Sequence, residues 1–210
     1  KYNLFFNNIF KTTFHKIYKS NNITTFMTWW IWGIPIALIT LVIIIFIYYY
    51  NKFVVQGNRI DNAISQIDVQ LKRRADLIPN LIETVKGYAK HEKSIIEDVT
   101  KARKAMLSAK DLPSRVKADD QLERALKSIF ALAENYPNLR ANENFLQLQN
   151  ELSATEDKVA YSRQYYNDSI LDFNNSIKVF PGTFFASLYK VKEREFIKIA
   201  PAERETPKVK

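Results

Sequence analysis

The chain has 210 residues, a formal net charge of +9 and no cysteine. The missing thiols exclude disulfides, thiolate catalysis and cysteine metal sites, and only four glycines are available for tight turns or phosphate-binding loops. Four lysines in the first 20 residues carry much of the excess charge. The remainder is mildly basic and well mixed, and it has no block of like charges typical of a nucleic-acid-binding arm.

Residues 1–28 form a basic, aromatic leader. Phe6, Phe10, Phe14 and Ile17 fall near one helical face, with lysines but no acidic residue nearby. This pattern is typical of a segment that lies on an anionic membrane surface. A disordered basic leader is the alternative interpretation.

Residues 29–50 are predicted to be a transmembrane helix. They lie in a charge-free interval between Lys19 and Lys52. As a helix they would extend about 33 Å, enough to cross a hydrocarbon core of roughly 30 Å. The run ends in tyrosines rather than in the small residues of a signal-peptide cleavage site. Aromatic side chains at both ends are the expected membrane-interface anchors: Trp29, Trp30, Trp32, Tyr48, Tyr49 and Tyr50.

Residues 51–182 are predicted to fold as an antiparallel, up-down four-helix bundle, followed by a C-terminal tail at 183–210. Two heptad seams of the coiled-coil type, starting at Ile60 and at Phe145, provide the apolar faces. The apolar pattern continues without interruption from 53 to 108, which favours one helix, whereas helix lengths that match in a bundle favour two. We expect a break near residue 90, with helices near 53–88, 91–108, 114–136 and 141–180. No segment alternates like a strand, so the fold class is all-α.

Three stretches resemble the signature of the LemA family: residues 68–92, which contain LKRRADLIPN, residues 154–168 (ATEDKVAYSRQYYND) and residues 173–181 (FNNSIKVFP). The closing segment 201–209 (PAERETPKV) is also similar. The resemblance implies a membrane-anchored antiparallel helical bundle in bacteria. It implies no catalytic residues, because none are established for the family.

Polar residues interrupt the two seams and predict a polar layer inside the bundle. A buried charge must be paired and hydrogen-bonded, since its burial otherwise costs several kcal/mol. We expect Arg74 or Arg73 and Asp76 to meet Arg163, Tyr166 and Asn167. Such a layer fixes the helix register, and a ligand or partner site is the sharper alternative. The full set of candidates is Arg73, Arg74, Asp76, Asn80, Glu92, Arg163, Tyr166 and Asn167.

The catalytic inventory is poor. The chain has two histidines, His15 and His91, and neither belongs to a Glu-x-x-His or His-Glu-x-x-His metal motif. The sequence therefore favours a noncatalytic protein-interaction or scaffolding module without cofactor, nucleic acid or small-molecule substrate. Its expected partners are the lipid bilayer and one or more unidentified proteins. The alternative is a metal-binding bundle or metal-dependent enzyme that uses Asp76, Glu83, His91, Glu92 and Glu156.

The predicted location is the bacterial cytoplasmic (inner) membrane, crossed once. Positively charged flanking residues tend to stay in the cytoplasm, and the leader has more of them than residues 51–70. This asymmetry favours the leader inside and the bundle outside.

Overall fold

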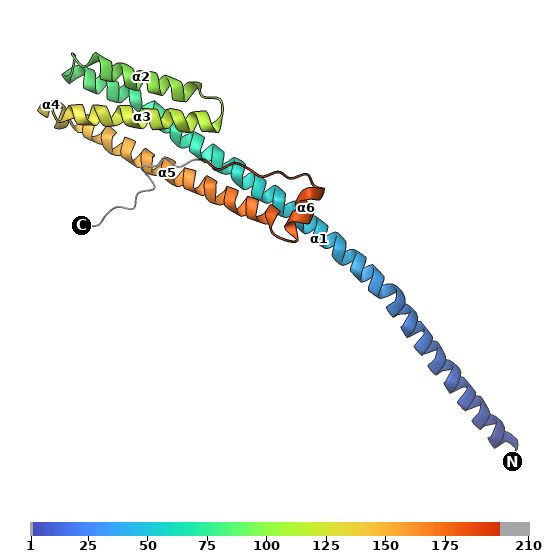
Figure 1. The fold of residues 1–210 in the computed structure, drawn as a ribbon. Coiled ribbons are helices and arrows are strands. Elements are labelled where there is room, and N and C mark those ends of the chain that lie inside the picture. The colour runs from blue at the N-terminus through green and yellow to red at the C-terminus, as the bar shows by residue number, and fades with distance from the viewer. Residues whose placement is uncertain (1, 198–210) are drawn as a thin grey trace, which may run out of the picture. The chain divides into compact units, whose positions relative to one another are not determined.

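The computed structural model describes the backbone of residues 2–197 and the side chains from residue 30 onward. Every element described in that range is a helix, which confirms the all-α prediction (Figure 1). In chain order the helices are α1 (Tyr2–Tyr88), α2 (Lys93–Ser108), α3 (Leu112–Ala133), α4 (Pro137–Arg140), α5 (Glu143–Lys178) and α6 (Gly182–Leu188).

Contacts divide the chain into two units, Lys1–Lys52 and Phe53–Lys210. In the first unit, the backbone of residues 2–28 is helical, and α1 continues through the predicted limits of the leader and of the apolar segment. None of the side chains from residue 30 to residue 52 is buried. This part of α1 belongs to the one helix of the described chain that is long and apolar enough to cross a membrane. The predicted leader face and the Trp29 anchor lie outside the described side chains.

The predicted break near residue 90 is confirmed. Helix α1 ends at Tyr88, four residues form a turn, and α2 begins at Lys93. The buried residues of α2 are Ile96, Val99, Ala102 and Met106, so the apolar spacing of the sequence continues on the buried face of the helix after the turn.

Side-chain caps begin two of the remaining helices, α3 and α5. The Asp111 side chain accepts a hydrogen bond of 2.8 Å from the backbone N–H of Ser114, and Asn142 caps α5 through the N–H of Phe145 at 3.0 Å. Helix α5 ends at Lys178, close to the predicted end near residue 180. The predicted boundary between bundle and tail at residue 182 coincides with the first residue of α6.

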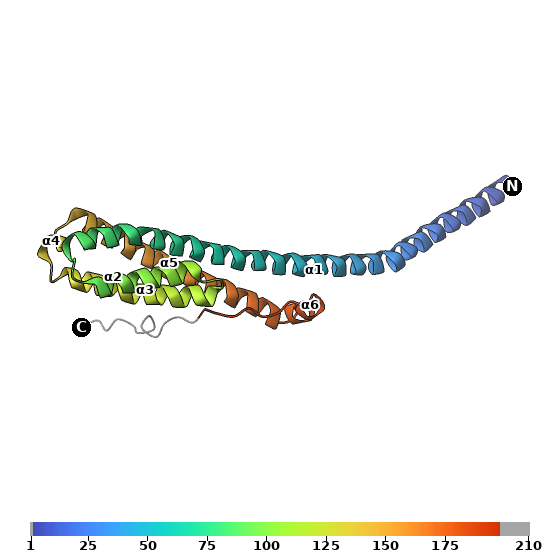
Figure 2. The same cartoon turned by 90° about the horizontal axis from the view of Figure 1, so that it is seen from above.

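In the second unit, α2 and α3 lie side by side along the end of α1 and the beginning of α5, as both views show (Figures 1 and 2). The second half of α5 extends beyond α2 and α3. Near its end it contacts α1, and the Ser176 hydroxyl donates to Oε1 of Gln56 at 2.6 Å. Fully buried apolar side chains from four helices fill the space between them: Ile60, Ile67, Ile78, Leu81, Val99, Leu122, Ile129, Leu152 and Ile170.

Candidate functional site: a buried ionic layer and an asparagine clamp

A buried ionic layer joins three helices at the centre of the second unit. The carboxylate of Asp119 on α3 accepts a hydrogen bond of 2.9 Å from Nη1 of Arg74 on α1. Its other oxygen accepts one of 2.8 Å from Nη2 of Arg163 on α5. All three side chains are almost completely buried. One aspartate therefore holds two arginines from opposite directions.

Two less buried carboxylates complete the layer. Glu156 accepts a hydrogen bond from Nη2 of Arg74 at 3.3 Å, and Asp120 accepts one from Nη1 of Arg163 at 3.1 Å. The Nε atoms of both arginines are buried and have no hydrogen-bond partner among the described residues. Burial raises the pKa of Asp119 and also that of Glu156, against the opposing effect of the guanidinium groups.

The predicted place of Asp76 in this layer is wrong. Its side chain is 56% exposed and lies 3.4 Å from Lys72 in a surface pair, whereas the side chain of Asp119 is 3% exposed. Residues two apart on a helix point about 160° apart, so Arg74 and Asp76 cannot both face the core. Arg73 and Asn80 are exposed as well. The sequence signal that was missed is Asp119 itself, three residues from both Val116 and Leu122 on the apolar face of its helix.

Glu92 also lies outside the ionic layer, at the opposite end of α2 from the loop that precedes α3. It is half-buried and accepts a hydrogen bond of 3.2 Å from the hydroxyl of Tyr136. Close by in sequence, Nδ2 of Asn142 donates to the hydroxyl of Tyr88 at 3.0 Å. These two bonds connect the turn after α1 to the segments that flank α4.

Tyr166 and Asn167, which were predicted to meet the arginines, instead form hydrogen bonds with the segment that follows α6, as does Asn174. Residues 191–197, here called the strap, run alongside α5. The Asn174 side chain donates to the carbonyl of Arg194 at 2.9 Å and accepts from its N–H at 3.0 Å. Asn167 makes the same pair with Ile197, at 3.1 and 3.0 Å. We call this arrangement the asparagine clamp.

The spacing of the clamp matches two different backbone geometries. Seven residues of α-helix separate the asparagines by about 10.5 Å, and three residues of extended chain cover about 10 Å. The strap therefore passes antiparallel to α5, with one asparagine at each third residue. Along the strap, Glu195 lies between the two clamped residues, and its carbonyl accepts a hydrogen bond of 3.1 Å from the Tyr166 hydroxyl. Burial raises the pKa of Tyr166, so its phenol stays protonated and able to donate.

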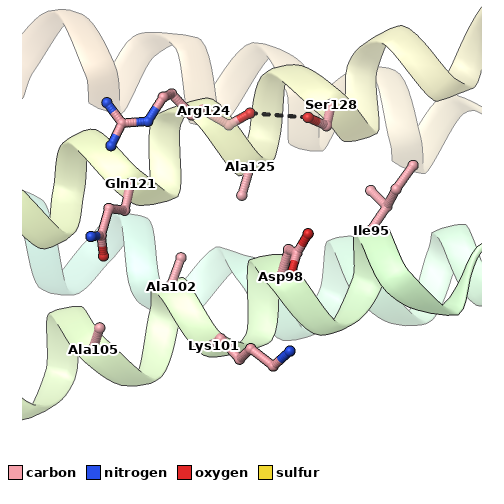
Figure 3. Close-up of a pocket in the computed structure, with 9 residues that line it drawn as sticks. All are labelled: Ile95, Asp98, Lys101, Ala102, Ala105, Gln121, Arg124, Ala125 and Ser128. Carbon is pink, nitrogen blue, oxygen red and sulfur yellow. Dashed lines mark hydrogen bonds between the residues drawn. The ribbon is translucent and has the colours of Figure 1, made fainter.

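A groove on the outer side of α2 and α3 has a volume of about 500 Å³ (Figure 3). Small side chains, among them Ala102, Ala105 and Ala125, leave the space open, and the charged side chains of Asp98, Lys101 and Arg124 line it. The sequence interpretation did not include this groove. Its signal is the set of alanines and Ser128 on the facing sides of two adjacent amphipathic helices.

Three of the four carboxylates considered for a metal site pair with other residues. Asp76 pairs with Lys72, Glu92 with Tyr136, and Glu156 with Arg74. Within the described part of the chain, no group of three or more histidine, aspartate or glutamate side chains is placed to hold a metal ion.

The model of the LemA family matches residues 63–210 of this chain, most of its length. The protein belongs to the LemA family. The match covers the whole ionic layer, the asparagine clamp and the strap, and it extends through the predicted tail.

Curated relatives of this LemA-family chain come from different bacteria. It is 27% identical over 146 residues to protein LemA of Metamycoplasma hominis, which covers 68% of this chain and 67% of the relative. It is 24% identical over 179 residues to the magnetosome protein MamQ of Magnetospirillum gryphiswaldense, covering 73% and 66%. MamQ 2 of Paramagnetospirillum magneticum matches to the same extent. The chain thus spans about two thirds of the length of these relatives.

Proposed function

We propose that this protein is a noncatalytic helical-bundle module, anchored in the bacterial cytoplasmic membrane by one span, that binds other proteins at the membrane surface. The observation that carries the proposal is the apolar part of α1. Large apolar side chains from Trp30 to Tyr50 are exposed on every side of that helix. In water such a surface is unfavourable, and a lipid bilayer is the solvent that suits it.

The second unit supports an interaction role. We infer that its four long helical segments form the antiparallel up-down bundle expected from the sequence, because each is followed by a short turn and they share one core. The ionizable side chains buried in that core pair with one another rather than line a cavity. The open groove between α2 and α3 offers a surface with both apolar and charged contacts for a partner protein. A role in assembly is in keeping with relatives that are named after a structure, the magnetosome, rather than after a reaction.

Alkaline carbonate extraction of bacterial membranes tests the anchor. The full chain should remain with the membranes. Placing two arginines in the apolar run, with Ile39→Arg and Ile43→Arg, costs about 2.5–3.5 kcal/mol each at the centre of a span and should release it. Val69→Arg is the matched control, because Val69 is an exposed apolar residue of the second unit. Extraction of the unmodified chain would refute the anchor.

The side of the membrane and the noncatalytic role need separate measurements. Reporter enzymes fused after Lys210 should be active only if they work in the periplasm. Elemental analysis of the purified protein separates the interaction module from the metal-binding alternative, because stoichiometric iron, manganese or zinc would overturn the former. Photo-crosslinking in living cells from Gln121, in the α2–α3 groove, should give a discrete adduct. The same crosslinker at Tyr161, an exposed position on α5, should not.

A further inference from the structure

Helix α6 is fixed against the beginning of the second unit by aromatic side chains. The ring of Tyr189, next to the end of α6, lies 6.4 Å from the ring of Phe53 in an edge-to-face arrangement and stacks on Phe185 at 6.5 Å. Phe185 and Ala186 are buried. One face of this short helix therefore packs on the α1 segment that starts at Phe53.

The opposite face of α6 is apolar and exposed. Phe180 is 82% exposed, Phe184 58% and Leu188 52%. Phe184 and Leu188 are four residues apart and share one side of α6, and Phe180 lies in the turn between α5 and α6. Val179, also exposed, extends the patch. Three large exposed apolar side chains in α6 and the turn before it, on an otherwise polar domain, indicate a surface that meets another phase or molecule.

The place of this patch in the chain indicates what covers it. Phe53 is only three residues after Tyr50, the last aromatic residue of the predicted span, so the two backbones are at most about 11 Å apart whatever the orientation of the units. A helix packed on Phe53 is consequently close to the headgroup layer in which Tyr50 would lie. Aromatic side chains are favoured in that layer because their rings are amphipathic.

Charge around α6 favours an anionic surface. Lys190 and Lys192 follow the helix and are exposed. The nearby acidic residue Glu193 is paired with Lys178 at 2.8 Å, so it is partly neutralised. Exposed lysines beside inserted apolar side chains are the usual composition of a segment that binds anionic lipid headgroups.

We propose that the outer face of α6, formed by Phe184 and Leu188, together with Phe180 in the turn before it, inserts into the interfacial layer of an anionic lipid bilayer and makes a second membrane contact beside the span. The proposal rests on the membrane anchor proposed above. It assigns to α6 a lipid-binding role that is separate from the span, because the residues involved lie more than 120 positions further along the chain.

The test uses the full chain in vesicles. Because the natural chain has no cysteine, Phe184→Cys gives one site for an environment-sensitive fluorophore. Tyr161→Cys is the control, because Tyr161 is an exposed aromatic residue on α5, about 26 Å back from the end of that helix. Each labelled protein is reconstituted into vesicles of phosphatidylcholine with and without one quarter phosphatidylglycerol, and flotation measures its association with the lipid.

At position 184 we expect a blue-shifted emission, a several-fold gain in intensity and quenching by lipids brominated near the headgroup, all stronger with phosphatidylglycerol. The label at position 161 should report water in both vesicles. Lys190→Gln combined with Lys192→Gln should remove the preference for the anionic lipid while leaving flotation unchanged.

Three negative outcomes are distinguishable. If the protein floats with the vesicles but the label at 184 reports water, the anchor stands and the role of α6 is refuted. If the protein does not float, the anchor fails and this inference fails with it. A blue shift that grows with the protein-to-lipid ratio, without quenching by brominated lipid, would assign the patch to a second copy of the chain and also overturn the proposal.

Discussion

The carbonyl oxygen of Ala75 accepts a hydrogen bond of 2.8 Å from Nε of Arg103. In an uninterrupted helix this carbonyl would accept the N–H of residue 79, but that residue is proline and has no N–H. Ala75 is fully buried, so water cannot replace the missing donor. An arginine from α2 thus satisfies the backbone group that Pro79 leaves open in α1.

This relationship gives a double-mutant test. Arg103→Met should lower the free energy of unfolding of the 53–210 unit by about 1–3 kcal/mol, because a buried carbonyl loses its partner. In a Pro79→Ala background the helix supplies its own donor, so the same change should cost clearly less. Urea unfolding followed by circular dichroism measures both, and Lys104→Met on the exposed side of α2 is the control. Equal losses in the two backgrounds would mean that Arg103 stabilises the protein by some other contact.

Asp119 should be the most sensitive charged residue of the bundle. Asp119→Ala removes the shared acceptor of two buried guanidinium groups and should lower the free energy of unfolding by about 3–5 kcal/mol. Asp76→Ala, on the surface, should cost less than about 0.5 kcal/mol. Chemical denaturation of the two variants side by side gives the comparison.

A rescue variant separates charge pairing from simple loss of packing. Replacing the layer with apolar side chains of similar size, as Arg74→Met, Asp119→Leu and Arg163→Met together, removes the unpaired charges and should recover most of the lost stability. If the triple variant is as unstable as Asp119→Ala, the layer is needed for its shape rather than for its electrostatics.

We expect the attachment of the strap to α5 to depend on the backbone N–H of Arg194 more than on the Arg194 side chain. Arg194→Pro removes the N–H that donates to Asn174, whereas Arg194→Ala keeps it. We expect amide hydrogen exchange in residues 191–197 to accelerate about tenfold in the proline variant, corresponding to roughly 1.4 kcal/mol, and to stay near wild type in the alanine variant. Asn174→Ala should resemble the proline variant, and Asn175→Ala, at the exposed neighbouring position, should not. Similar exchange in all four variants would exclude the clamp as the main restraint.

The hydroxyl of Tyr166 gives a pH dependence of defined sign. Its pKa is raised in the folded protein by burial, so above about pH 10 the unfolded chain loses this proton first. The folded state then binds more protons than the unfolded state, and its stability falls as the pH rises. The stability difference between wild type and Tyr166→Phe should be constant from pH 6 to 9 and shrink above pH 10. A difference that grows above pH 10 would contradict the protonated donor.

The sequence predicted the long helices well because local signals mark several of their ends. Asp111 and Asn142 are strong caps, Pro181 ends its helix region, and the apolar spacing identifies most core positions. The partner of Arg74 could not be obtained in the same way, because Asp119 lies 45 residues away and only the packing of α1 on α3 brings the two together. The asparagine clamp could not be predicted for a related reason. Its asparagines bind backbone atoms, which every residue of the strap has, so the sequence does not mark their partners.

The path of the strap depends on side chains of α5 rather than on its own side chains. The hydrogen bonds from α5 go to backbone atoms of Arg194, Glu195 and Ile197, and they come from Asn167, Asn174 and Tyr166. They do not involve the side chains of these strap residues. The side chains that determine its course therefore belong to α5. We expect positions 194–196 to tolerate most substitutions that keep the backbone N–H. Replacing Asn167 or Asn174 on α5 by aspartate would keep the acceptor for the strap N–H but remove the donor to the strap carbonyl. A substitution in α5 can therefore change the path of the strap although the sequence of the strap is unchanged.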